Sequence, residues 1–237
     1  MSQAVRSAAT AVPARLRRRR TADDARRAIL AAAEKRLIQG GPDAIRVQVI
    51  ARDLGITDPA IHYHFGTRDA LVEALMRYAG RRLKERIAGS IRRWPQDSFD
   101  MQALVDMIGE TYGNRGYARL AAWMALSGWS PHGSGMYREM AEAIHAVRAR
   151  QARAAGDRAP ELADTLFTLA LLNLVLFAEP LVGSALRRSV GLGADRDTAA
   201  RFRDWLVGVI EEHLTPRAAS PCDAGAGVRK GTRRPPT

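Results

Sequence analysis

Residues 47–66, with the sequence VQVIARDLGITDPAIHYHFG, decide how this chain folds. Four apolar side chains near the start of the stretch recur with the i, i+3, i+4, i+7 spacing of a short amphipathic helix: Val47, Ile50, Ala51 and Leu54. Gly55 then permits a left-handed turn, because glycine has no Cβ to clash. Thr57 or Asp58 can cap a second short helix, which tolerates Pro59 in its first turn and ends before Gly66. The stretch therefore predicts two short helices joined by a tight turn.

The same residues meet the packing demands of a helix-turn-helix. Two helices that cross steeply around a short turn need a small residue where they touch, and Ala51 supplies it. They also need a glycine in the turn and apolar side chains that face inward: Gly55, Ile50, Leu54, Ile56 and Ile61. The polar first turn of the second helix then stays free to enter the major groove of DNA.

Helical patterns continue on both sides of this motif. Residues 22–39 repeat an apolar side chain every four positions, and Gly40-Gly41-Pro42 ends that helix. Thr67 caps a long helix over residues 67–94. Further helices are expected over about residues 98–112, 116–129, 134–155, 160–188 and 195–214. No segment alternates strictly between apolar and polar residues, so no strand is expected and the predicted fold class is all-α.

The net charge of +12 is concentrated at the two ends of the chain. Residues 1–20 contain six arginines and no acid, and residues 217–237 contain four arginines, one lysine and one aspartate. The residues between these ends are nearly neutral. A run of like charge without an apolar period is typical of disorder, so we predict a disordered basic arm over residues 1–20 and a disordered tail over residues 216–237. A polyanion partner suits this arm.

Three parts of the N-terminal region resemble the DNA-binding domain of TetR-type transcriptional regulators: Gly40-Gly41, residues 47–57, and residues 61–71 with the sequence IHYHFGTRDAL. The ending, Tyr/His-x-His-Phe-x-x-Lys/Arg-Asp/Glu-x-Leu, is far more specific than a bare helix-turn-helix. The resemblance covers roughly residues 24–75. It implies a helix-turn-helix DNA-binding domain over residues 21–66, a connecting helix over residues 67–94, and a helical ligand-binding and dimerisation domain over residues 95–215.

The resemblance also implies which side chains meet DNA. Gln48 matches a position that often reaches a base edge, and Arg68 stands where a lysine usually binds phosphate. His62 replaces the usual phosphate-binding tyrosine, and Arg46 replaces a capping serine or threonine and could contact phosphate instead. Asp58 could accept a hydrogen bond from cytosine N4 or cap the helix, and capping is favoured. The predicted DNA-contact residues are Arg46, Gln48, Thr57, Asp58, Pro59, Ala60, His62, Tyr63, His64 and Arg68.

The C-terminal region suggests a ligand pocket and a dimer interface. Residues 101–140 are rich in methionine and aromatic residues, which form either ordinary core or an apolar pocket for a hydrophobic or aromatic ligand. The candidates for such a pocket are Met101, Tyr112, Trp123, Met124, Trp129 and Met140. Residues 162–186 are apolar almost all round, so this helix and the last helix could form half of a four-helix dimer interface. The candidates for that interface are Leu174, Phe177, Leu181, Phe202, Trp205, Leu206 and Val209.

The sequence contains few signals of secretion, membrane insertion or catalysis. The arginine run precedes a polar segment, and the single cysteine, Cys222, fits a reducing cytosol. The most apolar window, residues 166–183, contains Glu179 and Pro180, which favours a buried helix over a membrane span. His62 and His64, two positions apart, would point to different faces of a helix, which disfavours a metal site. We therefore predict no enzyme activity, cofactor or metal.

These observations together predict a homodimeric regulator in the bacterial cytoplasm, associated with the nucleoid. It would bind a palindromic operator in double-stranded DNA and leave it when a small hydrophobic or aromatic effector binds. Activation and repression both stay open, and the family resemblance favours repression. Two alternatives stay open. One is a non-specific architectural DNA-binding protein dominated by its basic tails, and the other is an all-helical enzyme that keeps a vestigial DNA-binding domain.

Overall fold

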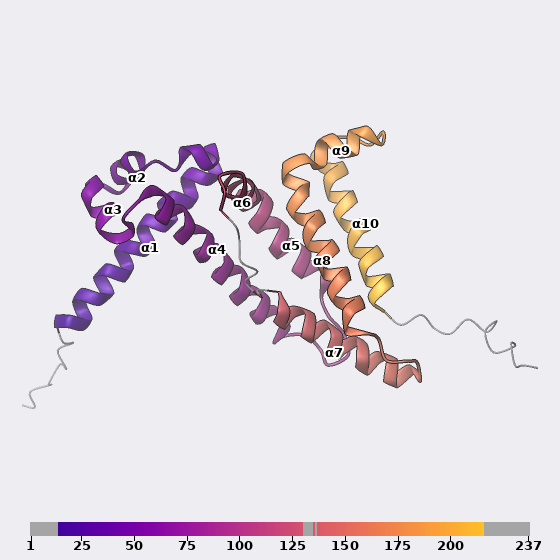
Figure 1. Cartoon of the computed structure of the whole chain (residues 1–237). Coiled ribbons are helices and arrows are strands. Elements are labelled where there is room, and N and C mark those ends of the chain that lie inside the picture. Colours follow the sequence, from indigo (N-terminus) through magenta and orange to yellow (C-terminus); the bar gives the residue numbers. More distant parts are fainter. Residues whose placement is uncertain (1–13, 130–134, 136, 216–237) are drawn as a thin grey trace, which may run out of the picture. The chain divides into compact units, whose positions relative to one another are not determined.

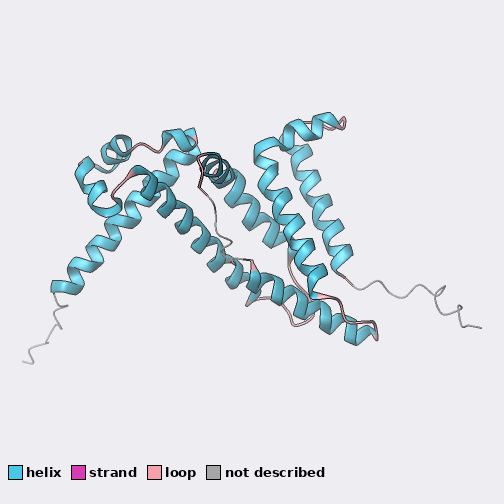
Figure 2. Ribbon diagram, viewed as in Figure 1, coloured by secondary structure: helices cyan, strands magenta, loops and turns pink. Residues whose placement is uncertain are grey.

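A computed structural model describes residues 14–129, 135 and 137–215, and these residues form helices and their connections without a strand (Figures 1 and 2). This confirms the all-α prediction. π-Helical turns at Glu110–Asn114 and Glu179–Gly183 follow α5 and α8. The helices are α1 Ala14–Gly40, α2 Val47–Leu54, α3 Asp58–Phe65, α4 Arg68–Ile91, α5 Met101–Gly109, α6 Tyr117–Leu126, α7 Arg138–Ala155, α8 Leu162–Ala178, α9 Ser184–Ser189 and α10 Arg196–Leu214.

The chain divides into two compact units whose borders differ from the predicted domains. The first unit comprises Met1–Glu85 and Ile108–Ser134, and the second comprises Arg86–Met107 and Gly135–Thr237. The predicted border between residues 94 and 95 therefore does not coincide with the observed division. The reason is packing, because Tyr117, Leu120 and Met124 of α6 lie in the same hydrophobic cluster as the buried side chains of α1 to α4.

Helix α1 begins at Ala14, which corrects the predicted start near residue 22. Residues 14–20, which the sequence placed in a disordered arm, are therefore helical, while residues 1–13 and the predicted tail lie outside the described residues. Residues 14–39 contain no glycine or proline, and alanine, leucine and arginine are good helix formers. The charge run hid the helix because it lacks an apolar face. The predicted apolar stripe is confirmed further along, where Ile29, Ala33 and Leu37 are buried.

A network of charged and polar side chains joins α7, α8 and α10 in the second unit. The buried Arg148 of α7 donates to Asp164 Oδ2 at 2.8 Å, to Thr165 Oγ1 at 2.6 Å and to the Leu214 carbonyl at 2.9 Å. His213 Nε2 lies 3.0 Å from the other Asp164 oxygen. Burial alone would raise the pKa of the Asp164 carboxyl, but hydrogen bonds from Arg148 and His213 lower it below its usual range. The charged form of Asp164 thus fixes the three helices to one another.

Helix α8 has apolar side chains on the face that packs against its own unit and also on the face that is exposed. Thr165, Leu169, Leu172 and Leu176 are buried in the unit. By length and hydropathy alone, the segment Leu162–Ser189 could cross a membrane, and 28% of its most apolar window is buried. The bonds from Arg148 and His213 to Asp164 tie one side of this helix to α7 and α10. The helix also exposes large apolar side chains: Leu162, Leu166, Phe167, Leu171 and Leu174.

Candidate DNA-binding site

The helix-turn-helix has the predicted geometry. Gly55 ends α2 in the left-handed conformation, with φ of 64°, and the Ile56 amide donates to the Ala51 carbonyl at 3.0 Å. Ala51 and Ile61 are buried where the two helices meet. The prediction that Ile56 faces inward is wrong, since its side chain is 38% exposed. It lies in the turn itself, where the backbone bond to Ala51 holds the chain and the side chain points away from the core.

The predicted DNA-contact residues of α2 and α3 lie mostly at the surface. Tyr63 is 81% exposed and stands edge-on to the His64 ring, with 5.3 Å between ring centroids. Asp58, Ala60 and His64 are half-buried. The exposed positions of the set are Arg46, Gln48, Thr57, Pro59, His62 and Tyr63. The first turn of α3 is therefore accessible enough to enter a groove of double-stranded DNA.

The start of α3 lacks the side-chain cap that the sequence suggested. Thr57 is the capping residue, but neither it nor Asp58 makes a capping hydrogen bond, and Asp58 is the first residue of the helix. The favoured role of Asp58 as a cap is therefore wrong. Its carboxylate still suits the positive end of the helix dipole. Arg46 is the capping residue of α2 and also makes no side-chain capping bond. Its Nε donates instead to the Asp43 carbonyl at 3.2 Å.

Two contacts at the end of α3 fix its orientation. His62 Nδ1 lies 2.6 Å from the Gly66 carbonyl, so the ring is held by the turn that follows the helix. Arg26 of α1 donates to the His64 carbonyl at 2.7 Å and lies 4.3 Å from the centroid of the Phe65 ring. Sequence analysis missed Arg26, and no periodic signal distinguishes it from the other arginines of α1.

Arg68 begins α4 and points back toward the connection between α1 and α2. Its Nε donates to the Ile45 carbonyl at 2.8 Å and its Nη2 to the Pro42 carbonyl at 3.0 Å. The Thr67 hydroxyl accepts from the Ala70 amide at 3.1 Å, which confirms the predicted cap of this helix. The phosphate-binding role of Arg68 stays a prediction, and the site's geometry gives this side chain other partners.

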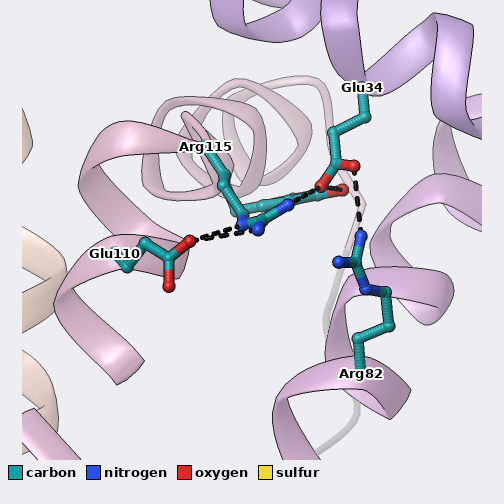
Figure 3. A network of polar contacts seen from close by, with 5 residues as sticks. Glu34, Arg82, Glu110 and Arg115 are labelled. Atoms are coloured by element: carbon teal, nitrogen blue, oxygen red, sulfur yellow. Dashed lines mark hydrogen bonds and ion pairs between the residues drawn. The ribbon is translucent and has the colours of Figure 1, made fainter. Parts of the chain in front are cut away.

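A buried carboxylate joins α1 to α4 and α6 in the same unit (Figure 3). Glu34 is 9% exposed and accepts hydrogen bonds from Tyr117 Oη at 2.9 Å, Arg115 Nη1 at 3.2 Å and Arg82 Nη1 at 3.3 Å. Arg115 also pairs with Glu110 at 3.0 Å. Burial raises the pKa of the Tyr117 phenol, and the Glu34 carboxylate raises it further, so the phenol stays a donor. Sequence analysis missed this network, because its members are far apart in the chain.

The comparisons with known proteins agree with this geometry. The sequence model for bacterial regulatory proteins of the tetR family matches residues 29–75, which span the end of α1 through the helix-turn-helix into α4. The HTH-type transcriptional regulator BetI of Vibrio parahaemolyticus is 27% identical over 93 residues, which are 39% of this chain and 47% of that protein. The chain thus spans about half the length of this curated relative. Residues 29–75 of the chain are therefore similar to bacterial regulatory proteins of the tetR family.

Two solved structures share the fold of this chain. A regulator from Saccharomonospora viridis in complex with choline is 18% identical, with a TM-score of 0.56, and the match covers 82% of this chain and all of that one. AibR in complex with isovaleryl coenzyme A and operator DNA is 16% identical, with a TM-score of 0.50, and the match covers 78% of this chain and 96% of that one. At these identities the likeness shows the fold alone.

The candidate ligand residues fall into the two cores of this chain. Trp123, Met124 and Trp129 pack with α1 to α4 in the first unit, whereas Met101 and Met140 are buried in the second. Tyr112 is half-buried. A cavity of about 630 Å³ opens in the second unit between α7, α10 and the connection that follows α7. None of the six candidates lines it, and its polar lining includes Arg148, Arg158, Glu212 and His213. No group of three potential metal ligands occurs in the part of the chain that the structure describes.

The candidate dimer residues divide into exposed and buried sets. Leu174, Trp205 and Val209 are exposed, and Trp205 stacks on Phe202 with 5.9 Å between ring centroids. Phe177, Leu181 and Phe202 are half-buried. Leu206 is only 6% exposed and belongs to the core of its own unit. Its side chain is therefore already covered within one chain, which corrects its place in the predicted interface.

Proposed function

We propose that this protein is a homodimeric repressor of the TetR type that binds a palindromic operator through α2 and α3. The observation that carries the proposal is the exposed first turn of α3 and the neighbouring Gln48, which stand on a helix-turn-helix whose inner face is buried. Such a motif places its second helix in the major groove, and a two-fold dimer matches two half-sites. The operator complex of AibR supports this role by analogy of fold. The protein would act in the cytoplasm, where bacterial DNA lies.

The dimer would form through the exposed apolar side chains of α8 and α10. Monomeric soluble proteins rarely expose long apolar patches, and such patches commonly mark contacts with another chain. The two helices lie against each other in each chain. Pairing them with the same helices of a second copy would create a four-helix arrangement with two-fold symmetry. It would cover Phe167, Leu171 and Leu174 on α8 together with Trp205 and Val209 on α10.

Substitution of Gln48 tests the operator proposal. Sequence selection from a random DNA pool should give the wild-type protein a two-fold symmetric site. Gln48→Ala should lose its preference at one base pair in each half-site, by about 5- to 160-fold, because a base contact contributes about 1–3 kcal/mol of discrimination. Gln102→Ala, on α5 of the second unit, is the control and should select the wild-type site.

A wild-type protein that enriches no sequence would instead favour the architectural DNA-binding protein. Identical profiles for the wild type and Gln48→Ala, each with a clear site, would keep the operator and remove the base-reading role of Gln48.

We further propose that a small hydrophobic or aromatic molecule releases the operator. The methionine and aromatic content of residues 101–140 supports this ligand class, since such side chains adapt to apolar ligands. The choline complex and the coenzyme A complex show that TetR-like folds take chemically different ligands.

The expected result is operator release by an apolar or aromatic compound at micromolar to millimolar concentration. Compounds of four classes should be compared by DNA binding and thermal shift: aromatic acids, apolar alcohols, quaternary ammonium ions and acyl thioesters. Release by only the last two classes would contradict the proposed chemistry.

A further inference from the structure

Arg68 occupies a position that leaves little of its guanidinium for DNA. Two of its nitrogens donate to the carbonyls of Ile45 and Pro42, at 2.8 and 3.0 Å. Both carbonyls belong to the short connection between α1 and α2, where Pro42–Ala44 forms a 3-10 turn. Its third nitrogen, Nη1, lies 3.8 Å from the Asp69 carboxylate of the same helix. The edge of the guanidinium thus faces this protein's own backbone.

The same guanidinium lies over an aromatic ring. The Arg68 Cζ lies 5.0 Å from the centroid of the Trp123 ring. Trp123 belongs to α6 and packs against the hydrophobic cluster of α1 to α4. An arginine over an indole is attracted by the negative face of the ring, and the attraction grows as both groups lose water. Only about a third of the Arg68 side chain is exposed.

We propose that Arg68 is a positioning residue that clamps α4, the α1–α2 connection and α6 into one arrangement, rather than a ligand for DNA phosphate. Its hydrogen bonds hold the segment that leads into α2, and its ring contact holds Trp123. Both contacts lie in the unit that carries the helix-turn-helix. The clamp therefore fixes the angle at which α2 and α3 are presented. The expected effect of the clamp on DNA binding rests on the proposed function. The contacts that form the clamp do not depend on that function.

The chemistry of arginine explains why this residue stands here. Lysine carries a compact charge that binds a phosphate well, but it lacks the planar surface that stacks on an indole. Its single ammonium also cannot reproduce the fixed fork of donors that reaches two separate carbonyls. The guanidinium does both at once. A second contact strengthens the connection of α6 to the same unit, since Tyr117 at its first turn donates to the buried Glu34.

The clamp predicts that lysine cannot replace Arg68. Thermal unfolding without DNA should show that Arg68→Lys, Arg68→Ala and Trp123→Leu each lower the midpoint by about 3 to 6 °C. The double variant Arg68→Ala with Trp123→Leu should lower it by clearly less than the sum of the single changes, because both remove the same contact. Arg77→Ala, an exposed position on α4 paired with Glu73, is the control and should change the midpoint little.

Salt titration of DNA binding separates the clamp from a phosphate contact. Arg68→Lys and Arg68→Ala should both weaken binding, by about 10-fold, and keep the wild-type slope of log K against log salt. A lost phosphate contact would instead make that slope shallower by about 0.9 per protomer. Arg46→Ala, at an exposed position predicted to meet phosphate, provides the comparison for such a change of slope.

Two results would overturn the inference. One is an Arg68→Lys protein that binds DNA and unfolds like the wild type, while Arg68→Ala flattens the salt slope. The other is strict additivity of the Arg68 and Trp123 changes in thermal unfolding. A wild-type protein without DNA affinity would contradict the proposed function alone, since the unfolding cycle still decides whether the clamp exists.

Discussion

Replacement of Trp205 by arginine is expected to convert the dimer into a monomer and to weaken operator binding by about 100-fold or more. Trp205 is 62% exposed in one chain and stacks on Phe202, so the single chain can tolerate the change. In the proposed dimer the same position is apolar, and a charge without a partner there is costly to desolvate. A monomer then holds one half-site without the gain in effective concentration that a second half-site gives.

Sedimentation and operator binding measured on the same samples decide this point. Ala154→Arg on α7 is also exposed and serves as the control, since it adds the same charge outside α8 and α10. It should stay dimeric and bind as the wild type does. A Trp205→Arg protein with unchanged dimer strength would place the interface elsewhere. Leu206→Arg is unsuitable for this test, because Leu206 is part of the core and the variant should fail to fold.

Deletion of residues 1–20 is expected to make DNA binding much less sensitive to salt. The segment contains six arginines, of which five lie between residues 15 and 20. These five lie near the start of α1, and Arg26 of the same helix bonds to the end of α3. If four arginines meet phosphates, the slope of log K against log salt should become shallower by about 3.6 per protomer. Between 50 and 200 mM salt this corresponds to about 150-fold in affinity per protomer.

The control for the deletion keeps the length of the chain and removes only its charge. Replacement of Arg17, Arg18, Arg19 and Arg20 by glutamine should reproduce the change in slope, while the ranking of operator sequences should stay nearly the same. Parallel salt titrations for the wild type and both variants would show that this segment does not touch DNA. Loss of all sequence preference on deletion would instead favour minor-groove reading by arginine.

The helix-turn-helix was predictable because its signals are local. Gly55 supplies the left-handed turn, Thr67 caps α4, and the apolar spacing from Val47 to Leu54 matches α2 to the residue. The π-helical turn at Glu179–Gly183 was not predictable in the same way. Pro180 has no amide hydrogen to donate, and the chain widens there by one residue and continues into α9. Periodicity alone therefore indicated one uninterrupted helix.

Contacts between distant residues escaped the sequence for a physical reason. Glu34 meets Arg82, Arg115 and Tyr117 only because α1, α4 and α6 pack together, and each of these residues alone resembles an ordinary surface charge or core aromatic. The same holds for Arg68, whose partners Pro42, Ile45 and Trp123 lie on other elements. Helical spacing identifies which face of a helix is buried, but it does not say which helix covers that face.

The apolar character of α8 also affects how the protein is made. Translation proceeds from the N-terminus, so α8 leaves the ribosome before α10, its neighbour in the folded unit, has been synthesised. At about 5–20 residues per second, the interval between Ser189 and Leu214 is about 1 to 5 s. During this interval Asp164 has no His213, and both faces of α8 are exposed. Slow codons or a pause within this interval should therefore lower the soluble yield more than the same pause after residue 214.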